Sequence, residues 1–175
     1  MELLKEIPEN LDYRDCNFEV RKAVRTVLLN DKGEMALLYV AADNYHKLPG
    51  GGIEEGESKM AALQREVEEE VGAKSKVIDN VGIIIEYRVP FDQYPTGLVQ
   101  ISYCYCSKVV GELKEPSFTK TELAKKFNLK WVPFLKGLKT VKNDKPKNKL
   151  GKFIQKRDLT FIKEAEKVIK NCCRN

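Results

Sequence analysis

The pattern of apolar and polar residues predicts a β-hairpin in the first quarter of the chain. Residues 19–41, EVRKAVRTVLLNDKGEMALLYVA, contain two runs rich in β-branched and apolar residues, one on each side of NDKG. Asn30, Asp31 and Gly33 are typical of turns, so the two runs are expected to pair as antiparallel strands. Similar runs predict three further strands, at residues 81–89, 97–110 and 128–134.

Two other segments carry the signals of amphipathic helices. Ser58 is a suitable N-cap for a helix that runs to about Val71, and Gly72 suits the position after its end. In the C-terminal part of the chain, apolar residues recur with helical period at Ile154, Phe161, Ile162, Ala165, Val168 and Ile169. Strands with one helix between them and one after them predict an α/β fold, in which a mixed sheet is covered on both faces.

Length and composition favour one globular domain spanning residues 1–175. The chain is 42% hydrophobic and 33% charged, and no apolar run approaches the roughly 20 residues that a membrane helix needs. The N-terminus, MELLKEIPENLDYRD, is acidic and interrupted by Pro8, which argues against a signal peptide. The five cysteines lack the CxxC spacing of zinc sites, and their odd number argues against a disulfide framework. These features predict a cytoplasmic protein with no membrane association.

Positive charge is concentrated in one segment, residues 136–157, which we call the basic segment. It holds nine Lys or Arg residues and one acid, Asp144, so its net charge is +8. The whole chain has a net charge of +5, so the remaining residues together carry −3. Three interpretations are open: a solvated loop, a rim that attracts phosphates by electrostatic steering, and a surface that binds RNA. Apart from Phe153, the segment lacks the aromatic residues that stack on single-stranded bases, which argues against RNA.

The stretch REVEEEVGA, residues 65–73, concentrates acidic residues within the first predicted helix. At about 100° per residue, one face of that helix should pack on the sheet through Met60, Leu63, Val67 and Val71. A second face, at positions i, i+3 and i+4, gathers the carboxylates of Glu66, Glu69 and Glu70. The face is either simply solvated or a binding site for Mg²⁺ or Mn²⁺, which prefer oxygen ligands. Arg65 is placed to reach back to Glu57 with both ends of its guanidinium.

The spacing around this helix resembles the Nudix box, G-x5-E-x7-R-E-U-x-E-E-x-G-U, in which U is a bulky aliphatic residue. The matching positions are Gly51, Glu57, Arg65, Glu66, Val67, Glu69, Glu70 and Gly72, and the lead-in LPGG also looks like the family. Ala73 departs from the pattern at the last aliphatic position but removes no ligand. Eight fixed positions at set spacing make this a strong motif, although it covers only 23 residues.

The resemblance implies an α/β/α sandwich and hydrolysis of a nucleoside diphosphate linked to another moiety. It implies Mg²⁺ as cofactor, with Mn²⁺ as an alternative. The implied metal ligands are Glu66, Glu69 and Glu70, together with the carbonyl of Gly50 or Gly51.

The box leaves the general base open. Glu66 and Glu69 are candidates within the box, and Glu112 and Glu115 follow the long strand at 97–110; we prefer Glu112 because it lies nearest the strand end. Solvated loop acids are an equally good interpretation of that pair.

Two residues at the end of the strand at 81–89 are candidate substrate ligands. Arg88 could bind a phosphate, and Tyr87 could stack on a nucleobase. His46 is the single histidine, and we leave it out of the site because a lone loop histidine is usually a surface residue.

Three functions compete on these grounds. A pyrophosphatase acting on small nucleotides leads, followed by an RNA 5′-pyrophosphohydrolase that uses the basic segment. A non-catalytic nucleotide-binding module comes last, because binding alone does not require all three box glutamates. The nucleotide itself is left open.

Overall fold

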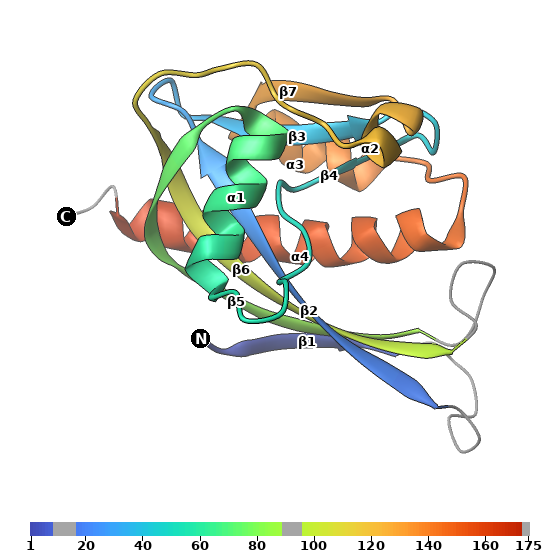
Figure 1. Ribbon diagram of the computed structural model, residues 1–175. Coiled ribbons are helices and arrows are strands. Elements are labelled where there is room, and N and C mark those ends of the chain that lie inside the picture. Colours follow the sequence, from blue (N-terminus) through green and yellow to red (C-terminus); the bar gives the residue numbers. More distant parts are fainter. Residues whose placement is uncertain (9–16, 89–95, 173–175) are drawn as a thin grey trace.

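The computed structural model describes residues 1–8, 17–88 and 96–172 of the chain (Figure 1). The strands are β1 (Leu3–Ile7), β2 (Phe18–Leu29), β3 (Glu34–Val40), β4 (Tyr45–Lys47), β5 (Lys74–Arg88), β6 (Gly97–Val110) and β7 (Phe127–Pro133). The helices are α1 (Lys59–Val71), α2 (Lys120–Ala124), α3 (Phe134–Asn143) and α4 (Lys149–Cys172). None of the helices in this part of the chain is long and apolar enough to cross a membrane.

The strands form one mixed seven-stranded sheet in the order β1-β5-β6-β2-β3-β4, with β7 paired to β3. β2 runs parallel to β6 along its whole length, whereas β5 is antiparallel to β6. The predicted hairpin is present, since β2 and β3 are antiparallel and joined through the turn at Asn30.

Two apolar layers cover the two faces of this sheet, which confirms the predicted α/β/α arrangement. On one face, Leu63, Val67 and Val71 of α1 pack with Val24 and Leu28 of β2. On the other face, α3 and α4 pack on the sheet through a cluster that includes Val141, Phe161, Ile162, Val27 and Ile84. Figure 1 shows α4 as one long helix running across the sheet, with α1 against β2.

The first predicted helix has the expected ends. The Ser58 side chain accepts a hydrogen bond from the Ala61 amide, and Gly72 ends the helix in the left-handed conformation with φ of 68°. The prediction that Met60 packs on the sheet is wrong, because Met60 is 45% exposed. Met60 has the helical angle of the buried stripe, but it lies in the first turn of α1, where Lys59, Met60 and Ala61 are all exposed.

Several elements differ from the sequence-based prediction. β5 starts at Lys74 rather than at residue 81, because its polar first half pairs with the end of β6. The short strands β1 and β4 and the short helix α2 were not predicted. The basic segment is not one loop: α3 and the first turns of α4 take up most of it.

Candidate active site

The loop at residues 48–52 lies along the middle of β2 and carries the first glycine of the box. Its backbone is fixed by two hydrogen bonds from β2, from the Val24 amide to the Gly51 carbonyl (3.0 Å) and from the Thr26 amide to the Pro49 carbonyl (3.1 Å). A β-carbon at Gly50, where φ is +128°, would strike the Val24 carbonyl. The loop therefore needs a glycine to lie this close to β2.

Arg65 links the loop to α1. Its Nε and Nη2 donate to the two carboxylate oxygens of Glu57, each at 3.0 Å, so the predicted contact with Glu57 is present. Nη2 also donates to the Gly52 carbonyl (3.0 Å), and Nη1 donates to Glu66 (2.9 Å) and Glu69 (3.4 Å). Hydrogen bonding to Arg65 lowers the pKa of Glu57, and hydrogen bonding to Glu57 raises the pKa of Arg65. The guanidinium thus fixes the loop and two of the box carboxylates together.

Glu70 is the most deeply buried carboxylate of the box. Its Oε1 accepts a hydrogen bond from Lys47 Nζ (2.6 Å), and its Oε2 accepts one from the Gly50 amide (2.7 Å). Burial raises the pKa of Glu70 to about 7, although Lys47 and the Gly50 amide oppose that rise. Glu70 therefore holds the glycine loop against α1 as well as presenting a carboxylate.

Glu66 and Glu69 both accept hydrogen bonds from Nη1 of Arg65. The Glu66 carboxylate lies against Gly51, where an added β-carbon would collide with it, while the Glu69 side chain is 38% exposed. Among the described residues, no group of three or more His, Cys, Asp or Glu side chains is gathered in a metal-binding arrangement. The donor atoms available at this end of α1 are nevertheless oxygens, which suit a hard divalent cation. The predicted ligand set stays a prediction.

The candidate base outside the box lies beside the C-terminal end of α1. Glu112 and Glu115 line a hollow of about 420 Å³ together with Glu68 and Gly72. Within the described residues, none of the hydrogen bonds or ion pairs joins Glu112 to Glu66, Glu69 or Glu70.

The two candidate substrate ligands on β5 point in opposite directions. Tyr87 donates to Glu6 of β1 (3.3 Å). Arg88 is buried, with its Nη2 donating to Glu86 (2.9 Å) and its guanidinium 5.4 Å from the centre of the Phe153 ring. The structure therefore places Arg88 beneath α4 and separates it from Tyr87.

Sequence reasoning missed a buried ionic cluster next to the loop. Asp158 of α4 accepts a hydrogen bond from the Leu48 amide (2.9 Å) and another from Arg157 Nε (2.7 Å). Arg25 of β2 is also buried, and burial together with Arg157 lowers its pKa to about 10. One signal was available: Arg25 interrupts the apolar run of β2, where a charged side chain is unusual.

The basic segment divides between surface and interior. Its eight lysines are exposed, whereas Arg157 is buried. Its one acid, Asp144, accepts hydrogen bonds from the backbone amide of His46 (2.7 Å) and pairs with its Nδ1 (2.9 Å). His46 also stacks on Tyr39 at 4.7 Å between ring centres, so its contacts are those of a structural residue.

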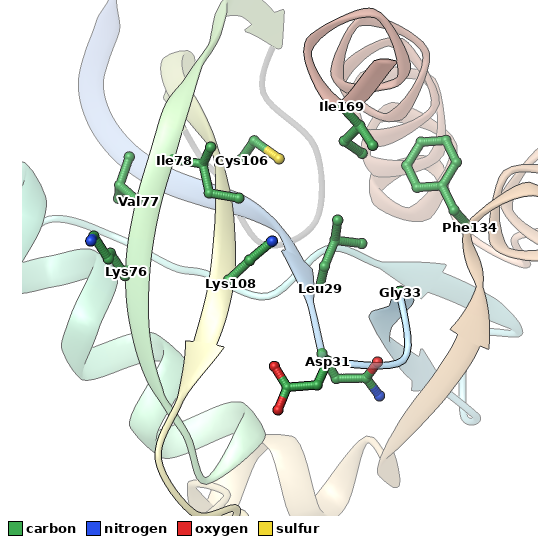
Figure 2. A pocket seen from close by; sticks show the side chains of 11 residues that line it. Leu29, Asp31, Gly33, Lys76, Val77, Ile78, Cys106, Lys108, Phe134 and Ile169 are labelled. Atoms are coloured by element: carbon green, nitrogen blue, oxygen red, sulfur yellow. The ribbon is translucent and has the colours of Figure 1, made fainter. Parts of the chain in front are cut away.

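A further hollow, of about 640 Å³, lies at the C-terminal end of β2, where Leu29 and Asn30 line it (Figure 2). Figure 2 shows it between Leu29, Ile169 and Phe134, with the side chains of Lys76 and Lys108 on another wall. It contains no box residue.

A family model of the NUDIX domain matches residues 19–150, well over half of the chain. The chain therefore belongs to the Nudix family. Members of this family generally use divalent metal ions.

Curated relatives include two proteins called RNA pyrophosphohydrolase. The one from Haemophilus influenzae (strain 86-028NP) is 27% identical over 122 residues, which is 65% of this chain and 62% of the relative. The one from Psychrobacter cryohalolentis is 32% identical over 83 residues, or 43% of this chain and 48% of the relative. Each match thus spans less than two thirds of the relative.

Solved structures share the fold at low identity. The crystal structure of MutT protein from Methanosarcina mazei Go1 aligns with a TM-score of 0.52 at 20% identity, covering 85% of this chain and 94% of that one. A NUDIX hydrolase from Nitrosomonas europaea aligns with a TM-score of 0.57 at 16% identity, covering 85% and 89%.

Proposed function

We propose that this chain hydrolyses a diphosphate bond in a nucleoside diphosphate linked to another moiety, with Mg²⁺ or Mn²⁺ as cofactor. The observation that carries the proposal is the joining of Glu66, Glu69 and Glu70 to one glycine loop through Arg65, Lys47 and the Gly50 amide. These three carboxylates would hold the cation. Gly50 is the better of the two carbonyl donors, because the Gly51 carbonyl already accepts the Val24 amide.

The bound cation supplies charge neutralisation for the diphosphate and a polarised water. The residues of the chain position the ligands and accept the proton. Arg65 keeps Glu66 and Glu69 in place, and Glu70 keeps the loop against α1. Glu69 is the better candidate to accept the proton of the attacking water, because it is half-exposed and its contact with Arg65 is the longest of the set. Glu112 is the rival, beside the C-terminal end of α1 and next to Glu68 and Gly72.

The proposal is tested with a panel of nucleoside diphosphate derivatives and Mg²⁺, scored for released phosphate groups. Glu69→Gln should lower turnover by roughly 10²- to 10⁴-fold, the usual contribution of a general base, with no change in melting temperature. Glu68→Gln is the matched control, since Glu68 is exposed on the same helix and its side chain accepts a hydrogen bond from Gln64. Full turnover in excess EDTA, or equal loss in both variants, contradicts the proposal. A large loss in Glu112→Gln alone would transfer the base to Glu112.

RNA is the second candidate substrate, and two observations favour it. Relatives called RNA pyrophosphohydrolase match this chain, and eight exposed lysines lie on α3, the following loop and the start of α4. An RNA substrate requires turnover of 5′-triphosphorylated RNA that falls steeply with salt, because displaced counterions accompany each phosphate contact. Turnover of RNA no faster than that of a mononucleotide, with the same salt dependence, excludes this candidate.

A further inference from the structure

The hollow of about 640 Å³ at the C-terminal end of β2 lies between the sheet and the helices α3 and α4 (Figure 2). We call it the Phe134 hollow, after the α3 residue on its wall. Residues from β2, β5, β6, α3, α4 and the turn after β2 line it. Pockets that bind small molecules have volumes of roughly 300–1,000 Å³, so the hollow is large enough for such a ligand.

Apolar side chains form most of the wall of the Phe134 hollow. They are those of Leu29, Val77, Ile78, Cys106, Phe134 and Ile169. Leu29 and Cys106 belong to the buried core on this face of the sheet, and Phe134 and Ile169 pack against that core. The hollow thus continues the core toward the surface, and a ligand with an apolar body would be stabilised by leaving water for it.

A β-bulge in β5 places Ile78 on this wall. The register of β5 against β6 passes from the Val77–Ser107 pair to the Asp79–Cys106 pair, so Ile78 is the extra residue of the bulge. Bulges redirect a side chain and are common next to active sites. Ile78 is 38% exposed, and it borders a hollow whose other walls are also apolar. An apolar ligand in the hollow would cover this exposed side chain.

Lys108 gives the apolar wall a positive charge. Figure 2 shows its side chain pointing into the hollow, with the amine between Ile78 and Leu29. Lys76, directly opposite Lys108 in the register of β5 and β6, also lines the hollow. Like charges at directly opposite positions of a sheet repel each other. Among the described residues, none of the ion pairs includes either lysine, and Asp31, the acid of the lining, pairs with neither. An anion bound here would therefore be attracted by both lysines.

We propose that the Phe134 hollow binds a small amphipathic carboxylate, with its charged group at Lys108 and its apolar body against Phe134 and Ile169. The lining holds two lysines and one acid, a net charge of +1, which a monoanion balances and a polyphosphate exceeds. The ammonium group of Lys108 can donate charge-assisted hydrogen bonds to a carboxylate. The hollow contains no box residue, so this inference does not rest on the proposed function.

The volume of the hollow limits the length of the ligand. At about 30 Å³ per non-hydrogen atom, the share of one water molecule in the liquid, a carboxylate of roughly eight to ten carbons takes up about half of the hollow. Longer chains would reach beyond it into water. Burial of the chain should therefore strengthen binding for each methylene added up to about this length.

Nucleotides and other strongly polar ligands find few partners in the Phe134 hollow. Asn30 supplies an amide to the described lining, but its own turn occupies it. The Nδ2 of Asn30 donates to Glu34 (2.9 Å), and its Oδ1 accepts hydrogen bonds from the backbone amides of Lys32 (3.0 Å) and Glu34 (2.9 Å). A base or a sugar requires several donors and acceptors. The lining favours an apolar ligand with one charge instead.

The test measures binding by isothermal titration calorimetry at low salt in EDTA, with fatty carboxylates and 1-octanol as probes. From hexanoate to decanoate, affinity should rise about two- to fourfold per methylene, as expected for burial of the chain. Octanoate should bind about two- to fivefold more tightly than 1-octanol, which has the same chain without the charge, because an exposed ion pair contributes that much.

Three variants locate the ligand. Lys108→Met should weaken octanoate about two- to fivefold and leave 1-octanol unchanged. Lys32→Met is the matched control, since Lys32 is exposed in the adjacent turn and does not line the hollow, and octanoate should keep its advantage there. Ile78→Ser should weaken octanoate and 1-octanol alike, by at least about threefold, because both bury their chain against Ile78.

Each outcome decides the inference. Affinity that does not rise from hexanoate to decanoate overturns it, and so does equal affinity for octanoate and 1-octanol; both comparisons use the wild-type protein. Equal weakening by Lys108→Met and Lys32→Met would mean that total charge attracts the carboxylate, and unchanged binding in Ile78→Ser would place the ligand elsewhere. Either result overturns the proposal. Nucleotide hydrolysis does not enter these measurements, so the proposed function and the carboxylate site can fail separately.

Discussion

Arg65 and Arg157 lie on helices that cover opposite faces of the sheet, and they differ in solvent exposure and in hydrogen bonding. Arg65 of α1 is 27% exposed, and its Nε, Nη1 and Nη2 all donate to Glu57, to the Gly52 carbonyl or to other box glutamates. Arg157 of α4 is fully buried, and both of its terminal nitrogens lack a hydrogen bond within the described structure. The arginine with access to water is thus the one whose bonds are complete.

The contrast separates two structural roles. An arginine with every donor occupied has nothing left to offer a substrate, so Arg65 is best understood as a support for the glycine loop and the box carboxylates. Arg157 pairs with Asp158 and Glu86 inside the core, and its burial is unfavourable unless these pairs compensate for it. We therefore expect changes at Arg65 to affect catalysis and changes at Arg157 to affect stability.

The largest effect is expected on stability, from Arg157→Met. The change leaves Asp158 and Glu86 buried with fewer partners, and breaking a buried pair in this way costs about 3–5 kcal/mol in the free energy of unfolding. Urea denaturation at neutral pH measures it. Lys156→Met, at an exposed neighbour on the same helix, is the control and should stay within about 0.5 kcal/mol of wild type. A cost below about 1 kcal/mol for Arg157→Met would show that these buried pairs do not stabilise the fold.

The pH dependence of stability tests whether burying the Glu70 carboxylate is unfavourable although both of its oxygens are hydrogen-bonded. Because its pKa is raised to about 7 from the usual 4.5, the folded state binds the proton more tightly than the unfolded state. The stability it contributes is complete below pH 4.5 and is lost as the pH rises through about 7. The free energy of unfolding should therefore fall with rising pH in this window, by up to about 1.4 kcal/mol per pH unit.

Glu70→Gln removes that titration and provides the comparison. The difference between wild type and variant, measured by urea denaturation from pH 4.5 to 8, should favour wild type less and less as the pH rises. The contributions of all other titrating groups cancel in this difference. A difference that does not change with pH would mean that Lys47 and the Gly50 amide fully compensate the burial of Glu70.

Arg65→Lys should affect catalysis more than stability. A lysine keeps the charge but cannot bond both oxygens of Glu57 while also holding Glu66, so the box carboxylates lose their fixed positions. We expect turnover to fall roughly tenfold, equivalent to about 1.4 kcal/mol in the barrier. The Michaelis constant should change less than turnover, because Arg65 makes no substrate contact. A raised Michaelis constant with unchanged turnover would contradict this role.

The same contrast explains which parts of the molecule the sequence could predict. Arg65, Glu57 and the three box glutamates lie within 14 residues, and helix geometry together with fixed spacing places their side chains. The hairpin around Asn30 and the caps of α1 are local in the same sense, and they were predicted. The prediction for Met60 is wrong because helical angle alone does not show that the first turn of α1, residues 59–61, is exposed.

The buried polar cluster of β5, β6 and α4 could not be predicted, because these elements lie far apart in the sequence. Its members are Glu86, Arg88, Gln100, Arg157 and Asp158. The sequence offered only weak signals: Glu86 and Arg88 end an apolar run, and Arg157 and Asp158 interrupt the apolar period of the last helix. Arg88 was chosen as a substrate ligand, but its partners follow from tertiary packing alone. The helix α3 was hidden for a different reason, since its lysines gave the segment the character of a solvated loop although Val141 is buried.

The smallest effect is expected from the exposed lysines, which lie outside both arginine sites. If they steer phosphates toward the site, Lys142→Gln, Lys145→Gln and Lys152→Gln combined should lower kcat/KM on a small nucleotide about two- to threefold at low salt. The effect should vanish at high salt, because the screening length shrinks to about 3 Å at 1 M ionic strength.

Three exposed lysines elsewhere, Lys74, Lys76 and Lys108, provide the control for net charge. Equal loss in both triple variants would mean that total charge, rather than the basic segment, attracts the substrate. A much larger loss on 5′-triphosphorylated RNA than on the mononucleotide would instead assign the basic segment to RNA binding, since phosphate contacts beyond the first nucleotide exist only in that substrate.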